Sequence, residues 1–492
     1  MQRSAGILLP ISSLPSPYGI GCFSQEAYDF VDWLKEAGQT YWQILPLGVT
    51  SYGDSPYQSF SAFAGNPYFI SLDALVEEGV LTAAECKKAN FGRKADDIDY
   101  SRLYTERGRL LRLAYSRSDI GHNEAFTAFC EKNKWWLDDF ALFMAVKDRF
   151  EGKPWIEWAE DIRLRWGNAM DYYRRELYFD IEFQQYLQYQ FYRQWNQLKT
   201  YANERGIQLI GDIPIYVAMD SADVWTHSDL FELDERKKPI HVAGVPPDCF
   251  SEDGQRWGNP LYRWKRMKRD HYAWWYQRMK ANAALYDVIR IDHFIGIVNY
   301  WSIPASCPTA VEGEWRKGPG RHLTKVIRKA TKGSDIIAED LGIVSDKVRA
   351  LINETGWPGM KILEFAFDGD ASNEYLPHQY KNTNCLVYGG THDNQTLLGY
   401  YGNKSDKELK FMMNYLHIKR VSQIPKAMLR AAYASIADTV IFQMQDILEL
   451  DDTARMNEPS TVGTNWRWRM QPGAFDGKKI KMLRKMCKLY AR

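Results

Sequence analysis

Short apolar runs that stop at turn or acidic residues recur along the chain, and each is typical of a buried β-strand. Eight such runs occur, at 7–10, 41–46, 208–214, 288–292, 336–339, 361–365, 385–388 and 439–442. Where strands and amphipathic helices alternate with short joints, the sheet is expected to be parallel. Because eight parallel strands close a (β/α)8 TIM barrel, we predict an α/β fold of this kind.

Helical patterns occur between these strands. Residues 24–38 begin at a Ser cap, place apolar residues three or four positions apart and end at Gly38. The basic tail at 478–490 places Ile480 and Leu483 on one face, with further apolar residues at similar spacing. This tail is therefore predicted to be an amphipathic wall helix rather than a nucleic-acid-binding arm.

Strand patterns nearly disappear between residues 72 and 204. Amphipathic helices are predicted there instead, with examples at 125–132, 138–150 and 180–203. We expect a mainly helical insertion at 72–204, whose last helix returns to the barrel wall. The remainder of the barrel would be formed by residues 1–71 and 205–492.

Two long polar stretches follow predicted strands, at 52–68 and 242–260, and both are rich in Gly, Pro and aromatic residues. In a TIM barrel, loops that follow the strands lie over the catalytic opening. We therefore expect both stretches to cover the opening. For the stretch at 52–68, the alternative is a packed surface loop without a role in binding.

Charge and cysteine content narrow the class of protein. The 63 Lys and Arg residues balance 62 Asp and Glu residues, so neither a nucleic acid nor an anionic membrane is expected as a partner. The 7 cysteines are scattered without a C-x-x-C pair, which favours reduced thiols in a cytoplasmic protein. No apolar run approaches the roughly 18 residues of a membrane span. The apolar run before Pro10 is too short to be expected as part of a signal peptide. The oligomeric state stays open.

Aromatic residues make up 14% of the chain, with 18 Trp and 30 Tyr. Such side chains combine an apolar face with a polar tip, which suits stacking on sugar rings. For any single ring, ordinary core packing is the default interpretation.

One strand carries both a cation and an acid. In the run 288–292, alternation places Val288, Arg290 and Asp292 on one face and two isoleucines on the other. An arginine beside the aspartate is expected to lower its pKa and keep it ionised, as a carboxylate nucleophile requires. The alternative is a structural ion pair that closes the strand end.

Carboxyl groups lie at the ends of several predicted strands: Asp212, Asp292, Glu339 and, after a short turn, Asp393. In a barrel these ends converge on one opening, where neighbouring acids shift each other's pKa values apart. An ionised acid and a protonated one, about 5–5.5 Å apart, are what a retaining glycosidase mechanism needs. Each acid alone is more often a helix cap or an arginine partner.

Other chemistries find little support in the sequence. The motifs H-E-x-x-H, C-x-x-C, G-x-G-x-x-G and G-x-S-x-G are absent, so a His-based metal site, a dinucleotide and a serine nucleophile are not expected. His293 and His392 lie beside two of the acids, and each could also be a core or capping residue. We expect no metal and no organic cofactor.

Several motifs together resemble one family. Arg290–Phe294 (RIDHF), 338–342 (AEDLG) and 391–394 (THDN) are similar to the catalytic motifs of the amylomaltases, the 4-α-glucanotransferases of glycoside hydrolase family 77. Further matches lie at 53–58, 211–214, 254–260 and 465–469. The resemblance runs from the first strand to the end of the chain and is weakest in the helical insertion.

The resemblance implies a role for each matching residue. Asp292 would be the nucleophile, Glu339 the general acid and base, and Asp393 the acid that holds sugar hydroxyls and stabilises the transition state. The residues implied to bind substrate are Ser55, Tyr57, Asp212, Trp257, Arg290, His293, Asp368, His392 and Asn465. Tyr57 would pack on the transferred glucose unit, and Trp257 with the loop 245–255 would lie over the glucan.

The implied activity is the disproportionation of α-1,4-glucans. Its partners would be α-1,4-glucans, maltooligosaccharides and glucose, with transfer to a 4-hydroxyl group. An α-glucan hydrolase on the same barrel is the nearest alternative, since only the loops separate the two. A glucan-binding protein without turnover is a third, although binding alone needs no pair of nucleophile and acid.

Overall fold

The computed structural model describes residues 3–248, 251–342 and 344–492. Within them, parallel strands form an eight-stranded sheet in the order β10-β11-β12-β1-β2-β3-β6-β9. Their bounds are β1 (Ser4–Leu8), β2 (Tyr41–Gln43), β3 (Gln208–Ile213), β6 (Val288–Ile291), β9 (Asp335–Ala338), β10 (Gly359–Ile362), β11 (Cys385–Tyr388) and β12 (Thr439–Gln443). Ala338 N donates to Pro358 O at 3.0 Å and joins the two edges of the sheet.

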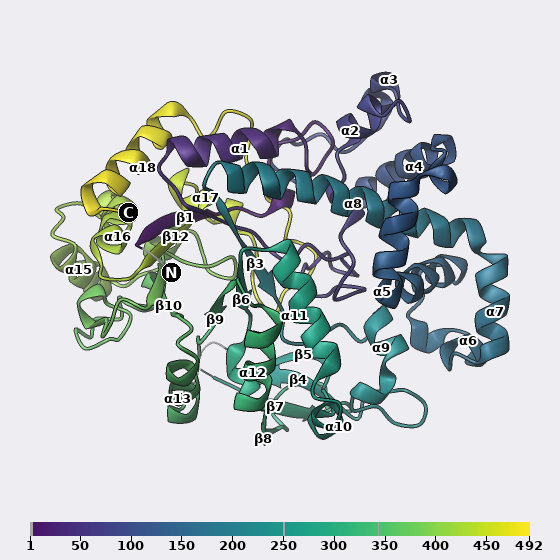
Figure 1. Ribbon diagram of the computed structural model, residues 1–492. Helices are drawn as coiled ribbons and strands as arrows, with labels where there is room; N and C mark the ends of the chain where they lie inside the picture. Colours follow the sequence, from purple (N-terminus) through teal and green to yellow (C-terminus); the bar gives the residue numbers. More distant parts are fainter. Residues whose placement is uncertain (1–2, 249–250, 343) are drawn as a thin grey trace.

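The predicted barrel is confirmed, and all eight predicted strands are present (Figure 1). Strand alternation separates two apolar layers. Val288, Ile337 and Ile441 belong to a cluster inside the barrel, whereas Ile289 and Ile291 belong to the large cluster under the helices. The second half of the predicted strand at 361–365 differs, because the chain turns there into a short 3₁₀ helix, η7 (Leu363–Phe365).

The barrel wall contains the helices that the apolar spacing predicted. Helix α1 (Gln25–Glu36) follows Ser24 and buries four apolar side chains, and the chain leaves it at Gly38 with a φ of +74°. Helix α18 (Gly477–Tyr490) packs on α1 and on α16 (Ile424–Ala434), so the tail is a wall helix as predicted. In the described part of the chain, no helix is both long and apolar enough to cross a membrane.

From Leu72 to Glu204 the described chain is mainly helical and lies at one side of the barrel (Figure 1). The helices are α2 (Leu72–Glu77), α3 (Ala83–Lys88), α4 (Tyr100–Arg117), α5 (Glu124–Arg149), α6 (Glu160–Arg163), α7 (Gly167–Glu176) and α8 (Tyr178–Glu204). Helix α5 is continuous where two helices were predicted, because the buried Trp136 and Leu137 carry its apolar face across the gap. Helix α8 contacts α5, α1 and β3.

A second, antiparallel sheet corrects the prediction of a long loop at 242–260. Its strands, in the order β5-β4-β7-β8, are β4 (His241–Val245), β5 (Gln255–Pro260), β7 (Asn299–Pro304) and β8 (Glu314–Lys317). The valines of β4 and Trp257 of β5 favour strands, so the loop is confined to 246–254. Cys249 and Phe250, which belong to the predicted loop, lie outside the described residues.

The remaining helices connect the strands. They are α9 (Ala222–Thr226), α10 (Trp264–Arg269), α11 (Ala273–Leu285), α12 (Arg321–Ala330), α13 (Asp346–Thr355), α14 (Leu397–Gly402), α15 (Asp406–Tyr415) and α17 (Met444–Ile447). The two ends of the chain meet at the barrel wall, where the Arg492 guanidinium donates to the carbonyl oxygens of Ser4 and Asp438 at 3.1 Å each.

Candidate active site

A buried arginine joins two acids at the carboxyl ends of β3 and β6. Nη1 of Arg290 lies 2.6 Å from Oδ2 of Asp212 and 3.0 Å from Oδ1 of Asp292. The side chains of Arg290 and Asp212 are almost inaccessible, whereas 27% of the Asp292 side chain is exposed. The ion pair predicted from the strand pattern is therefore present, and only Asp292 of the three reaches the open side.

Glu339, at the end of β9, lies against the residue that follows Asp292. The backbone N–H of His293 donates to Glu339 Oε2 at 2.7 Å, and that of Leu341 donates to Oε1 at 2.9 Å. His293 has a φ of +50°, in the left-handed region that few non-glycine residues adopt. Two acids from different strands are thereby placed at one opening, as the barrel predicted.

Burial decides the protonation of these acids. It raises the pKa of Asp292 well above the ordinary value, and Arg290 opposes that increase without cancelling it. The prediction that arginine would hold this pKa down is therefore wrong in its net direction, because desolvation outweighs the ion pair. Burial raises the pKa of Glu339 to about 7, so this acid holds a proton over part of the neutral range.

Asp393 forms the other side of the site, on the turn between β11 and α14. Asn394 Oδ1 closes this turn by accepting from N and Oγ1 of Thr391, at 2.8 Å each. Asn457 Nδ2 donates to Asp393 Oδ1 at 2.6 Å, and His392 Nε2 lies 3.4 Å from Oδ2. Burial lowers the pKa of His392, which keeps its ring neutral.

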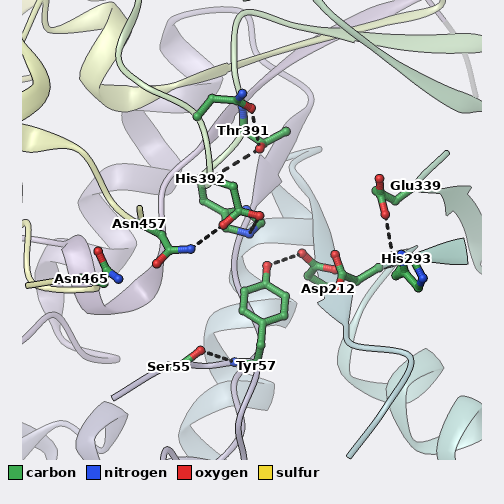
Figure 2. A network of polar contacts seen from close by, with 12 residues as sticks. Ser55, Tyr57, Asp212, His293, Glu339, Thr391, His392, Asn457 and Asn465 are labelled. Atoms are coloured by element: carbon green, nitrogen blue, oxygen red, sulfur yellow. Dashed lines mark hydrogen bonds and ion pairs between the residues drawn. The ribbon is translucent and has the colours of Figure 1, made fainter. Parts of the chain in front are cut away.

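Tyr57 connects the two sides, as Figure 2 shows. Its hydroxyl donates to Asp212 Oδ2 at 2.7 Å, and its ring stacks on that of His392 with centroids 5.1 Å apart. Ser55 Oγ accepts from the backbone N of Tyr57 at 3.3 Å and steadies the turn that carries it. The loop after β2 thus reaches both acid groups, and Trp466 packs beside the pair of rings.

The antiparallel sheet also reaches the site. Trp257 of β5 contacts the ring of His293 nearly at right angles, with centroids 4.9 Å apart. Burial lowers the pKa of His293 to about 4, so its ring is neutral at pH 7. An apolar and aromatic wall therefore stands next to Asp292 on the side of the second sheet.

Two predicted residues are not connected to this cluster. Asp368 is exposed in a turn after η7, where its oxygens accept from Asp370 N and Asn373 Nδ2 at 2.9 Å each. The amide of Asn465 bonds to the loop that precedes it, with Glu458 N and Thr461 O each 3.0 Å away. Their roles as sugar contacts stay predictions.

The sequence reasoning did not identify Asn457, Arg455 and Trp466 as site residues. Trp466 lies within the motif at 465–469, so the motif was a usable signal for it. Asn457 and Arg455 meet Asp393 across more than 60 residues of chain, and their local pattern carries no chemical signal. Across the described residues, no group of three or more His, Cys, Asp or Glu side chains is arranged to hold a metal ion.

A parallel barrel with two carboxyl groups close together at the carboxyl ends of its strands, here Asp292 and Glu339, is the arrangement found in a class, the glycoside-processing TIM barrels. Within it, residues 9–475 match the model of glycoside hydrolase family 77, described as 4-alpha-glucanotransferase. The chain belongs to this family.

Known proteins agree with this placement over nearly their whole lengths. The 4-alpha-glucanotransferase of Clostridium butyricum is 46% identical, covering 98% of this chain and 99% of the relative. That of Streptococcus pneumoniae serotype 4 is 48% identical, covering 95% and 93%. The solved amylomaltase of Streptococcus agalactiae in complex with acarbose superposes with a TM-score of 0.97 at 41% identity, covering 100% of both chains.

Proposed function

We propose that this 4-α-glucanotransferase moves segments of α-1,4-glucans onto the 4-hydroxyl group of another maltodextrin or of glucose. The observation that carries the assignment of residues is the hydrogen bond from His293 N to Glu339, which brings this acid beside Asp292. Family membership and the acarbose complex of a similar amylomaltase support the class of substrate.

The first step forms a covalent ester. Oδ of Asp292 attacks the anomeric carbon, the glycosidic C–O bond breaks, and Glu339 gives its proton to the departing oxygen. The pKa of about 7 at Glu339 suits this role, because a protonated acid is then available near neutral pH. Arg290 stabilises the carboxylate form of Asp292, which is the form that attacks.

The second step reverses the chemistry with a sugar in place of the leaving group. Glu339, now a carboxylate, takes the proton of the acceptor 4-hydroxyl group as its oxygen attacks the same anomeric carbon. The ester bond breaks, and Asp292 leaves as a carboxylate. Two inversions retain the α configuration.

The surrounding residues hold the sugar. Asp393, with 45% of its side chain exposed, accepts hydrogen bonds from sugar hydroxyl groups. It also stabilises the positive charge that develops on the sugar ring in the transition state. The other proposed sugar contacts are residues around the acids, together with Asp368 and Asn465 from turns that are not connected to this cluster. They are Ser55, Tyr57, Asp212, Trp257, Arg290, His293, Asp368, His392 and Asn465.

Transfer requires that an acceptor sugar outcompetes water. The stretches at 52–68 and 242–260 are the candidates, because their aromatic residues can stack on a sugar and exclude solvent when the acceptor site is filled. Helix α8 anchors the first loop, since Gln188 exchanges two hydrogen bonds with the backbone of Gly65 at 2.7 and 2.9 Å. In the same proposal, 72–204 is a helical insertion, and the enzyme works in the cytoplasm.

Incubation with pure maltotriose tests the function directly. We expect glucose together with maltooligosaccharides longer than the substrate, at a constant total number of reducing ends, as measured by sizing every product and assaying glucose. Glucose and maltose without longer products, with a rise in reducing ends, would instead identify a hydrolase. Binding without any product would identify a glucan-binding protein.

A further inference from the structure

Asn457 is the hydrogen-bond donor that holds the Asp393 carboxylate. The residue lies on the segment after α17, and its amide points to the turn at 391–394 (Figure 2). Nδ2 is 2.6 Å from Asp393 Oδ1, and the backbone N of Asn457 donates to His392 O at 3.1 Å. One residue therefore contacts both the acid and the backbone that carries it.

Arg455 fixes the distance between the two segments. Its Nη2 donates to the backbone oxygen of Asp393 and its Nε to that of Asn457, at 2.9 Å each. The guanidinium thus bonds to the main chain of both segments, and its nearest carboxyl oxygen among the ion pairs is that of Glu458, at 3.9 Å. Arg455 holds the backbones together while leaving the Asp393 carboxylate to Asn457.

The donor that binds the Asp393 carboxyl group is a neutral amide, that of Asn457, rather than a charged side chain. Asn457 and the neutral His392 ring lie against the Asp393 carboxyl group, and Arg455 bonds to main-chain oxygens. Asp292 and Tyr57 are also close enough to interact with Asp393 electrostatically. An amide orients a carboxylate without neutralising it, unlike the guanidinium that pairs with Asp212 and Asp292. With 45% of its side chain exposed, Asp393 can face the sugar ring, where positive charge develops in the transition state.

We propose that Asn457 is a positioning residue for the transfer reaction, which orients the charged Asp393 carboxylate toward the sugar through a neutral hydrogen bond. This inference rests on the proposed function, because it assumes the role given there to Asp393. It assigns Asn457 to the reaction without contact to the reacting atoms.

A double-mutant cycle separates positioning from general stability. Asn457→Leu, which keeps the size and removes the donor, should lower kcat/KM for maltotriose about 10- to 100-fold, mainly in kcat. In an Asp393→Ala background the same substitution should cost less than about 2-fold, because the group it positions is gone. An equal loss in both backgrounds would overturn the proposal.

Asn457→Asp gives the second readout, a pH profile. Two carboxyl groups at this distance repel each other when both are charged, so they share one proton at low pH and ionise together only at higher pH. At low pH the new acid holds a proton and donates it to Asp393 as the amide did, while at high pH it repels Asp393. The ratio of wild-type to variant kcat/KM should therefore grow about 10-fold between pH 5.5 and 8. This factor corresponds to a repulsion between the two carboxylates that is equivalent to a pKa shift of about one unit.

The matched control is Asn414→Asp on the exposed face of α15, which should leave the pH profile unchanged. A constant ratio for Asn457→Asp across pH, or wild-type kcat/KM for Asn457→Leu, would overturn the inference. If thermal melting shows that Asn457→Leu does not fold, the pH profile of the nearly isosteric Asn457→Asp variant tests the inference instead. Full activity of Asp393→Ala would instead refute the proposed role of Asp393, which is a separate outcome.

Discussion

The acids on the two sides of the site differ in their burial and in the groups that bind them. On the side of β3, β6 and β9, a buried guanidinium pairs with Asp212 and Asp292, and Glu339 receives two backbone N–H groups. On the side of β11, Asp393 is half exposed and receives a neutral amide. The acids of the first side can exchange a proton and form a bond, whereas the second side presents a half-exposed carboxyl group that an amide orients.

The comparison shows that carboxyl groups of the same chemistry acquire different properties from their burial and from their hydrogen-bond partners. Burial raises the pKa of Glu339 to about 7, so this acid holds a proton that it can give near neutral pH, while Arg290 favours the charged form of Asp292. Tyr57 touches both sides, through its hydroxyl on Asp212 and its ring on His392. Substitutions on each side should therefore have effects of different size and kind.

The largest effect is expected at the nucleophile. Asp292→Asn should lower the rate of glucan transfer by at least about 10⁴-fold, because the side-chain amide cannot replace the carboxylate that forms the glucosyl ester. Binding of glucan, measured by calorimetry, should persist. Asp335→Asn, at the opposite end of β9, is the control and should keep wild-type activity. Turnover by Asp292→Asn at a near wild-type rate would contradict the assignment.

The next effect concerns the general acid. Glu339→Gln should slow cleavage of natural glucans by about 10²- to 10⁴-fold, because the departing oxygen is no longer protonated. Bond cleavage in an α-glucosyl donor with a good leaving group should suffer much less, as measured by release of that group. An equal loss for both donors would show that Glu339 acts on something other than the leaving group.

The pH profile sharpens this assignment. A pKa of about 7 at Glu339 means that the acid form is lost above that pH, so kcat/KM of the wild type should fall on the alkaline side with a midpoint near 7. Glutamine does not titrate, so the alkaline limb should disappear in Glu339→Gln. An unchanged limb in this variant would assign the titration to another group.

A smaller effect is expected from weakening the ion pair. Arg290 lowers the pKa of Asp292, so Arg290→Lys, with a shorter reach, should raise that pKa and move the acid limb of kcat/KM to higher pH. The loss at pH 5 should exceed the loss at pH 7 by about 5-fold, for a pKa shift of one unit. A limb that stays in place would show that Arg290 does not control Asp292.

The smallest effect is expected at the residue that bridges the two sides. Tyr57→Phe keeps the ring on His392 and removes the hydrogen bond to Asp212, so kcat/KM should fall by about 10-fold or less. Tyr57→Ala, which also removes the stacking ring, should cost more and raise KM. Equal losses in the two variants would place the whole contribution in the hydroxyl group.

Much of this architecture could be predicted because the signals are local. The eight strands are short apolar runs, and an acid at a strand end, such as Glu339, must lie at the barrel opening once the sheet closes. The pairing of Arg290 with Asp292 followed from strand alternation alone. The family resemblance supplied the roles.

The remainder depends on contacts that no local pattern encodes. Burial, which sets the pKa of Asp292, depends on what surrounds the side chain and is absent from the run 288–292. Strand β4 pairs with β5 on one side and, on the other, with β7, which lies some 40 residues further along the chain than β5. Asn457 meets Asp393 through a turn and a loop far apart in sequence.

The central claim is that Asp292 carries the glucosyl group between donor and acceptor. Glu339→Gln enzyme, incubated with an α-glucosyl fluoride donor that needs no acid, should accumulate the ester because the base for the second step is missing. Digestion and mass spectrometry should find one glucosyl unit on the peptide that contains Asp292. The same unit on another residue, or unmodified enzyme after fluoride has been released in an amount equal to the enzyme, would contradict the account.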